Sequence, residues 1–139
     1  MKIETWRSSL DKTEKQMSLK YFKLSEFDSP DAPGSGKNMK KVFLKKIDKA
    51  RDIAGVSFII TSGFRTLELH ESLREQGYKA SPNSSHLKGL AADISCTDSG
   101  TREKIVNGLI MAGFTRVGIA DTFIHCDTDT DKKDAIWLY

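Results

Sequence analysis

A single carboxylate, Asp93, interrupts the run GLAADIS at residues 89–95, whose other members are small or apolar. Such a run favours a central β-strand, and an ionised carboxylate buried in a strand costs several kcal/mol unless a cation, an arginine or backbone N–H groups compensate it. His86 precedes this run, and a turn at Gly89 would bring the imidazole and the carboxylate together. The fold must therefore place a compensating group beside Asp93, and a divalent metal is one candidate.

The stretch FIHCDTD, which begins at Phe123, is a second place where polar and apolar residues alternate. Strand geometry places Phe123, His125 and Asp127 on one face and the apolar Ile124 and Cys126 on the other. A second imidazole would complete a set of two histidines and one carboxylate, which is a natural set of zinc ligands that leaves the fourth position open. Iron(II) accepts the same ligands, so ligand type alone does not decide the metal.

Periodicity divides the chain into helices and short strands. Helices are expected over 39–54, 67–77 and 99–113, and β runs over 56–61, 89–95, 117–120, 122–128 and 135–139. Ser99 or Thr101 is expected to cap the last helix, and alternation over 21–27 predicts an extended segment. The pattern favours an α+β domain, with N-terminal helices packed on a small antiparallel sheet, over a doubly wound α/β fold. Residues 1–20 are expected to form an arm or helix, and residues 21–139 a single domain.

The composition is that of an ordinary globular domain. The 139 residues carry a net charge of +3, a small excess that does not indicate a nucleic-acid-binding domain. No apolar run approaches the roughly 20 residues of a membrane span, and the N-terminus lacks the apolar core of a secretory signal. Cys96 and Cys126 form no CxxC pair, which favours two buried, reduced thiols. We therefore expect a monomer that neither inserts into a membrane nor binds nucleic acid.

Three motifs stand in register along the chain. SSHLKGLAAD supplies Ser84, His86 and Asp93 in the pattern Ser-x-His, six residues, Asp. FIHCD supplies the later His125, and TSGFRT places Arg65 in a turn directly after a predicted strand. Together these motifs resemble the zinc D-alanyl-D-alanine carboxypeptidase family, in particular its small single-domain members from phages and bacteria. The resemblance covers the whole predicted domain and implies the fold that this family shares with the hedgehog signalling domain.

The resemblance implies a zinc ion held by His86, Asp93 and His125, whose bound water attacks a peptide carbonyl of the peptidoglycan stem. Arg65 is implied to bind a substrate carboxylate or carbonyl, for which its guanidinium offers a fixed fork of donors. Ser84 is expected to donate a hydrogen bond beside His86. The expected activity is that of a D,D-carboxypeptidase or an endopeptidase acting on peptidoglycan stem peptides.

The general base is the point at which the chain departs from the family. Many members place a glutamate three residues before the last histidine, and Thr122 stands there. Asp127, on the strand face of His125, and Asp121, if the chain turns sharply near it, are the two candidate bases. The small members that this chain resembles carry a His-x-Asp, which favours Asp127. Asp127 fits equally well a residue that orients a ligand imidazole. The remaining histidine, His70, is expected to face solvent or to pack rather than to bind metal.

Thr122 also keeps a second class of function open, a catalytically silent, metal-containing module that binds peptidoglycan or serves in a phage particle. The chain as given carries no signal peptide, so we expect synthesis in the cytoplasm and action on the cell wall. A phage lysis or virion protein and a trimmed exported protein both fit that expectation.

Overall fold

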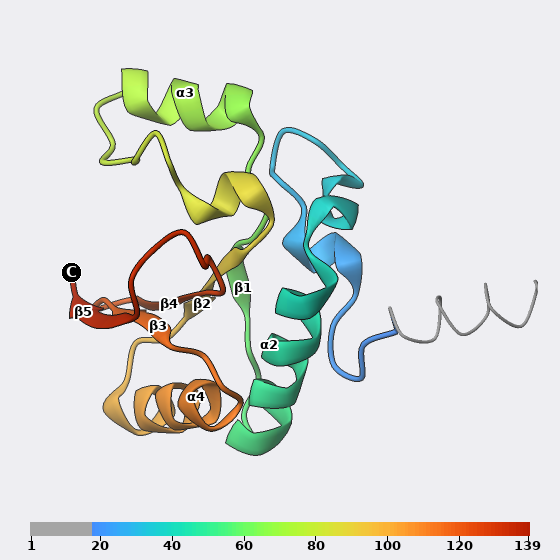
Figure 1. The fold of residues 1–139 in the computed structure, drawn as a ribbon, viewed down its shortest axis with the longest axis vertical. Helices are drawn as coiled ribbons and strands as arrows, with labels where there is room; N and C mark the ends of the chain where they lie inside the picture. Colours follow the sequence, from blue (N-terminus) through green and yellow to red (C-terminus); the bar gives the residue numbers. More distant parts are fainter. Residues whose placement is uncertain (1–17) are drawn as a thin grey trace, which may run out of the picture.

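The computed structural model describes residues 18–139, which form three α-helices, three short 3₁₀ turns and a five-stranded sheet (Figure 1). The helices are α2 (Lys41–Ala54), α3 (Leu67–Glu75) and α4 (Ser99–Met111). The strands are β1 (Ile60–Ser62), β2 (Ala91–Ser95), β3 (Arg116–Ile119), β4 (Phe123–Asp127) and β5 (Ala135–Leu138). The 3₁₀ turns are η1 (Leu24–Phe27), η2 (Ser35–Asn38) and η3 (Ser85–Lys88). Most of the expected N-terminal arm, residues 1–17, lies outside the described residues.

The strands lie in the order β1-β2-β4-β3-β5. Every neighbouring pair is antiparallel except β3 and β5, which are parallel. The α+β class predicted from the sequence is confirmed, and the sheet differs from the expected one in this single pair. The parallel pair arises because the chain leaves β4, crosses past β3 through residues 128–134, and adds β5 at the outer edge. Within residues 18–139, no helix is long and apolar enough to cross a membrane.

The two faces of the sheet have different roles. One face packs against α2 and α4, and the shared core contains Phe43, Leu44, Ile47, Ile94, Ile105, Leu109, Val117, Ile124 and Cys126. Because side chains alternate along a strand, Asp93 and His125 point away from this core. In Figure 1, α4 lies below the strands, whereas η3 and α3 lie above them. The sheet thus separates a helical core from a polar face on which a site can form. Both cysteines are buried and free, as predicted.

Two local predictions were wrong. Residues 24–27 form the 3₁₀ turn η1 instead of extended chain, and buried Phe27 packs against Phe22 with ring centroids 5.3 Å apart. The cap of α4 is Asp98, not Ser99 or Thr101: the Asp98 carboxylate accepts a hydrogen bond from the Thr101 backbone N–H. A carboxylate also complements the positive end of the helix dipole, which a hydroxyl does not.

A glycine lets α4 approach α2 closely. A Cβ on Gly108 would lie 2.6 Å from the Ala50 carbonyl oxygen and 2.8 Å from the Ala54 Cβ. These neighbours are a helix backbone and a short side chain, which have no freedom to rotate away. The helical layer behind the site therefore depends on the missing side chain at Gly108.

Gly108→Ala should lower the free energy of unfolding by about 1–3 kcal/mol, the usual effect of overpacking a close contact. Gly100→Ala is the matched control in the same helix, because its nearest neighbour is an Asp98 carboxylate oxygen at 3.6 Å. Alanine favours helix over glycine by about 1 kcal/mol, so the control should be neutral or stabilising. Chemical denaturation measures both, and equal effects of the two variants would contradict the close-packing account.

Candidate metal centre

One row of residues crosses all five strands and sets the position of the site. Asp93 on β2 pairs directly with His125 on β4. Ser62 on β1 lies on the other side of Asp93, Gly118 on β3 lies on the other side of His125, and Trp137 on β5 follows Gly118. The register of the sheet therefore makes Asp93 and His125 neighbours, although 32 residues separate them.

His86 approaches this pair from η3. The Ser84 side chain caps η3 by accepting a hydrogen bond from the His86 backbone N–H, and Gly89 ends it with a φ of 70°. The His86 Nδ1 lies 2.8 Å from the Gly63 carbonyl oxygen. Because a carbonyl only accepts, Nδ1 carries the hydrogen, and Nε2 faces the Asp93 carboxylate, 3.5 Å from its Oδ1. The turn predicted at Gly89 is confirmed.

His125 is held in the opposite sense. Its Nε2 lies 2.7 Å from the Asp127 Oδ2, and its Nδ1 lies 2.9 Å from the Asp93 Oδ1. Asp127 thus contacts the nitrogen that points away from Asp93. The strand alternation predicted for FIHCD, with His125 and Asp127 on one face, is confirmed.

Three ligand atoms, one each from His86, Asp93 and His125, lie within 4.8 Å of one another. Among the described residues this is the one group of three or more His, Cys, Asp or Glu side chains close enough to share an ion. One nitrogen of each imidazole is already bonded elsewhere, to Gly63 or to Asp127, so the other is left for a metal. Two imidazole nitrogens and a carboxylate oxygen fit zinc with one position open.

The pKa values of Asp93 and His125 are shifted in opposite directions. Burial alone would raise the pKa of Asp93, but hydrogen bonds from His125 and His86 outweigh it and hold that pKa well below its usual range. Burial alone would lower the pKa of His125, but hydrogen bonds to Asp127 and Asp93 outweigh it and raise that pKa. Because a ligand nitrogen must be unprotonated, the raised pKa of His125 makes a metal compete with a proton for that nitrogen.

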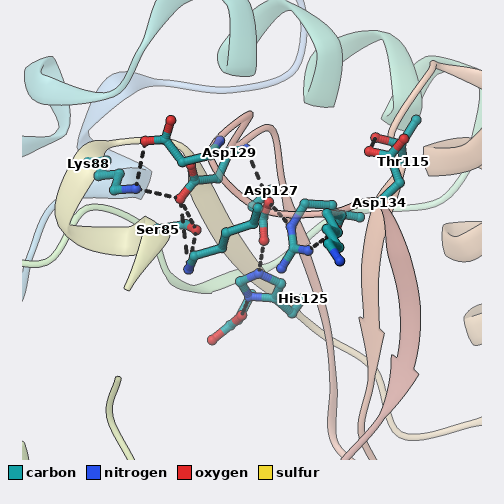
Figure 2. Close-up of polar contacts among 12 residues, drawn as sticks. Ser85, Lys88, Thr115, His125, Asp127, Asp129 and Asp134 are labelled. Carbon is teal, nitrogen blue, oxygen red and sulfur yellow. Dashed lines mark hydrogen bonds and ion pairs between the residues drawn. The ribbon is translucent and has the colours of Figure 1, made fainter. Parts of the chain in front are cut away.

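Asp127 is fully engaged behind His125 (Figure 2). It is 1% exposed, and its Oδ1 accepts hydrogen bonds from Arg116 Nε at 2.7 Å and from the Asp129 backbone N–H at 3.1 Å. Burial alone would raise the pKa of Asp127, but these bonds and the one to His125 lower it, so the carboxylate stays ionised. This geometry matches an orienting group for the imidazole.

A second buried carboxylate, Asp129, ties η3 to the chain that leaves β4 (Figure 2). Its Oδ2 accepts hydrogen bonds from Ser85 Oγ at 2.7 Å and Lys88 Nζ at 2.9 Å, and Lys132 Nζ lies 3.8 Å away. The segments that carry His86 and Asp127 are therefore joined by charge-assisted bonds. Sequence reasoning missed this network, although the alternation of acids in CDTDTD was the signal for it.

Arg65 lies beside the metal ligands, in the turn after β1 where it was predicted. Its Nη2 lies 3.2 Å from the Oγ of Ser62, which pairs with Asp93 across the sheet. Its Nη1 lies 3.2 Å from the His70 Nδ1. Burial lowers the pKa of Arg65 and the nearby Asp93 charge opposes that shift, so the guanidinium remains a cation.

The other predicted site residues lie elsewhere. Asp121 is exposed in the turn between β3 and β4, where its carbonyl oxygen accepts a hydrogen bond from Arg102, and Thr122 follows it in the same turn. The Ser84 hydroxyl serves as the cap of η3. The structure brings His86, Asp93 and His125 together, with Asp127 behind them, and leaves Asp121 at the far end of β4.

An aromatic residue covers the outer side of His125. The rings of Trp137 and His125 have centroids 5.4 Å apart, and the Arg116 guanidinium carbon lies 4.9 Å from the Trp137 ring centroid. A Cβ on Gly118 would lie 2.6 Å from Trp137 Cε2, so only glycine lets the indole lie against β3. Trp137 therefore restricts movement of the His125 ring on a side where no hydrogen bond holds it.

Asp93→Asn should weaken zinc binding by more than about 100-fold, since removal of a supporting partner alone typically costs 10- to 100-fold. Asp121→Asn, the same change at an exposed carboxylate, should leave zinc affinity unchanged. Titration calorimetry with zinc measures both, and circular dichroism checks the fold. Parent-like zinc affinity in Asp93→Asn would rule out this group as the metal centre.

A comparison with known proteins bears on the whole chain. The family model described as Peptidase M15 matches residues 4–127, which include His86, Asp93, His125 and Asp127. No curated protein and no solved structure matches the chain. The match spans well over half of the sequence, so the chain belongs to the M15 peptidases, a family resembling the zinc D-Ala-D-Ala carboxypeptidases.

Proposed function

We propose that this protein hydrolyses peptide bonds in peptidoglycan stem peptides with zinc, as a D,D-carboxypeptidase or an endopeptidase. The observation that carries the proposal is the convergence of His86, Asp93 and His125. In each imidazole the nitrogen that faces away from Asp93 is held by a hydrogen bond, to Gly63 or to Asp127. Three protein ligands with an open position are typical of catalytic zinc, whereas structural zinc has four. Family membership supports peptide hydrolysis in general, and the stem peptide is the finer proposal.

The protein supplies the ligands and the substrate contacts. When bound, zinc lowers the pKa of water to about 7 and polarises carbonyl groups, which is the chemistry that peptide hydrolysis needs. Arg65, held beside Asp93 through Ser62, presents its remaining N–H groups to a substrate carboxylate or carbonyl. A free C-terminal carboxylate would suit a carboxypeptidase, and an internal carbonyl an endopeptidase.

We assign Asp127 to the orientation of His125 in place of the role of general base. Both of its oxygens are bonded, and its contact with His125 is on the nitrogen that faces away from Asp93. An orienting carboxylate fixes the tautomer of the imidazole and raises its basicity as a ligand. Asp121 stays a candidate base. It is exposed in the β3–β4 turn, which does not place it beside the three ligand residues.

A catalytically silent module is the second candidate, and the engagement of Asp127 favours it. A metal-containing domain without a free base beside its ligands would bind stem peptides without cutting them. In either case the proposed partner is the cell wall, which a phage lysis protein, a virion protein or a trimmed exported protein could each reach, and the proposed state is a monomer.

Incubation of the zinc-loaded protein with purified, cross-linked peptidoglycan should release D-alanine or shortened cross-links, identified by mass spectrometry. Chelation of the metal should stop the release, and added zinc should restore it. Because the products name the bond, the same digest separates carboxypeptidase from endopeptidase action. Stem-peptide binding without any product would favour the silent module.

Asp127→Asn should lower zinc affinity by about 10- to 100-fold and recover most of its turnover once zinc is saturating, because the variant weakens orientation rather than proton transfer. Asp134→Asn is the control, since this nearby exposed carboxylate bonds to Thr115. The opposite pattern, with parent zinc affinity and turnover lower by about 10²–10⁴-fold, would make Asp127 the general base.

A further inference from the structure

His70 is a buried histidine that the metal centre does not use. It lies on α3 and is 1% exposed. The sequence left open whether it faces solvent or packs, and burial excludes the first. A buried imidazole needs hydrogen-bond partners for its two nitrogens, and the identity of those partners shows what His70 does.

Both nitrogens of His70 are bonded, to groups of opposite character. Nε2 lies 2.6 Å from the Ser81 carbonyl oxygen, and Nδ1 lies 3.2 Å from Nη1 of Arg65. A carbonyl only accepts and a guanidinium only donates, so Nε2 carries the hydrogen and Nδ1 offers its lone pair. The two partners therefore select one neutral tautomer, in which His70 is an acceptor for Arg65.

Arg65 is restrained from two other directions. Its Nη2 donates to Ser62 Oγ at 3.2 Å, and its backbone N–H donates to the His86 carbonyl oxygen at 3.2 Å. The two terminal nitrogens of the guanidinium are thus each held by one contact. The Nε–H and one hydrogen on each terminal nitrogen are left for a substrate.

We infer that His70 is a positioning residue that aims Arg65 at an anionic or carbonyl group of the substrate. The inference rests on the proposed function, in which Arg65 contacts the stem peptide. A free arginine side chain loses rotamer entropy when a ligand immobilises it. The contacts with His70 and Ser62 immobilise it beforehand, so substrate binding meets a smaller entropic penalty.

The same series of hydrogen bonds extends to the segment between α3 and η3. The Ser81 carbonyl oxygen accepts hydrogen bonds from both His70 Nε2 and the Ser84 backbone N–H. His70 therefore joins that segment to Arg65. The bond to Ser81 sets the tautomer of the imidazole, and the bond to Arg65 transmits that choice to the site.

Two isosteric substitutions separate the two bonds. The amide oxygen of asparagine can occupy the place of Nδ1 and accept from Arg65, but asparagine does not reach Ser81. The amide nitrogen of glutamine can occupy the place of Nε2 and donate to Ser81, but glutamine offers no acceptor at the place of Nδ1. His70→Leu removes both bonds, Arg65→Ala gives the full loss, and Glu71→Gln is an exposed control on the same helix.

The first arm measures two quantities. One is the hydrolysis of stem peptide by the zinc-loaded protein, and the other is the affinity of the protein for zinc. We expect His70→Gln and His70→Leu to lose about 10- to 100-fold in kcat/KM, the loss of one hydrogen bond to a charged group. His70→Asn should lose less than about threefold. The loss should fall mainly on KM, because Arg65 holds the substrate before reaction as well as during it. Zinc affinity should match the parent in all variants.

Equal losses in His70→Asn and His70→Gln would mean that His70 only packs, and would overturn the inference. Retention in His70→Gln with loss in His70→Asn would overturn it as well, because the Ser81 bond alone would then matter. A loss of zinc affinity in step with activity would place the effect on the metal centre instead of Arg65.

The second arm does not depend on turnover. Nitrogen-15 NMR of the zinc-loaded protein should show His70 as the Nε2–H tautomer and resolved, slowly rotating Nη groups for Arg65. The Arg65 signals should persist in His70→Asn and collapse in His70→Gln. If the parent cuts no peptidoglycan, the proposed function fails, but this arm still tests whether His70 positions Arg65. Observation of His70 as the Nδ1–H tautomer would overturn the positioning inference.

Discussion

The site depends on the pairing of Asp93 with His125 across β2 and β4. The pairing puts a carboxylate and an imidazole side by side on the face of the sheet that points away from α2 and α4. A slip of either strand by one residue would turn its polar side chain into the core, where Ile94 and Ile124 now lie. The hydrophobic pattern that specifies the register therefore also specifies the position of the candidate metal centre. The buried charge that a strand would otherwise exclude is compensated by two histidines.

The ligands are held from behind by groups that a metal does not touch. A backbone carbonyl at Gly63 fixes the ring of His86, and the Asp127 carboxylate fixes the ring of His125. Arg116 on β3 and the Asp129 backbone N–H then hold the Asp127 carboxylate, and the Asp129 carboxylate accepts a hydrogen bond from Ser85 in η3. The other nitrogen of each imidazole faces the Asp93 carboxylate. The buried carboxylates Asp127 and Asp129 lie at the end of β4 where they support the site, and the indole of Trp137 on β5 packs beside His125.

The sequence was most informative where a short period carried the signal. Alternation in FIHCD correctly predicted which face of β4 is polar, and the apolar run around Asp93 correctly predicted β2. The family motifs supplied the ligand set, which the structure brings together. The parallel placement of β5 was not predictable from spacing, because the composition of residues 128–134 fits a hairpin loop as well as a short crossover.

The supports of the site were harder to foresee, because they join distant segments. The group that holds His86 is the backbone carbonyl of Gly63, which every residue type possesses, so the sequence gives no signal for it. Lys88 and Asp129 lie 41 positions apart in the sequence. The bond between His70 and Arg65 spans five residues, yet it is defined by Ser81, whose carbonyl carries no sequence signal. The role of Asp127 turned on which nitrogen of His125 it meets, a detail that alternation along the strand does not contain.

A crystal structure of the zinc-soaked protein, with anomalous data collected at the zinc edge, shows directly which atoms bind the metal. We expect one strong anomalous peak about 2.0–2.2 Å from His86 Nε2, an Asp93 carboxylate oxygen and His125 Nδ1, with Asp127 still bonded to His125 Nε2. A zinc ion bound through His125 Nε2, or coordinated by Asp127 in place of Asp93, would overturn this ligand assignment.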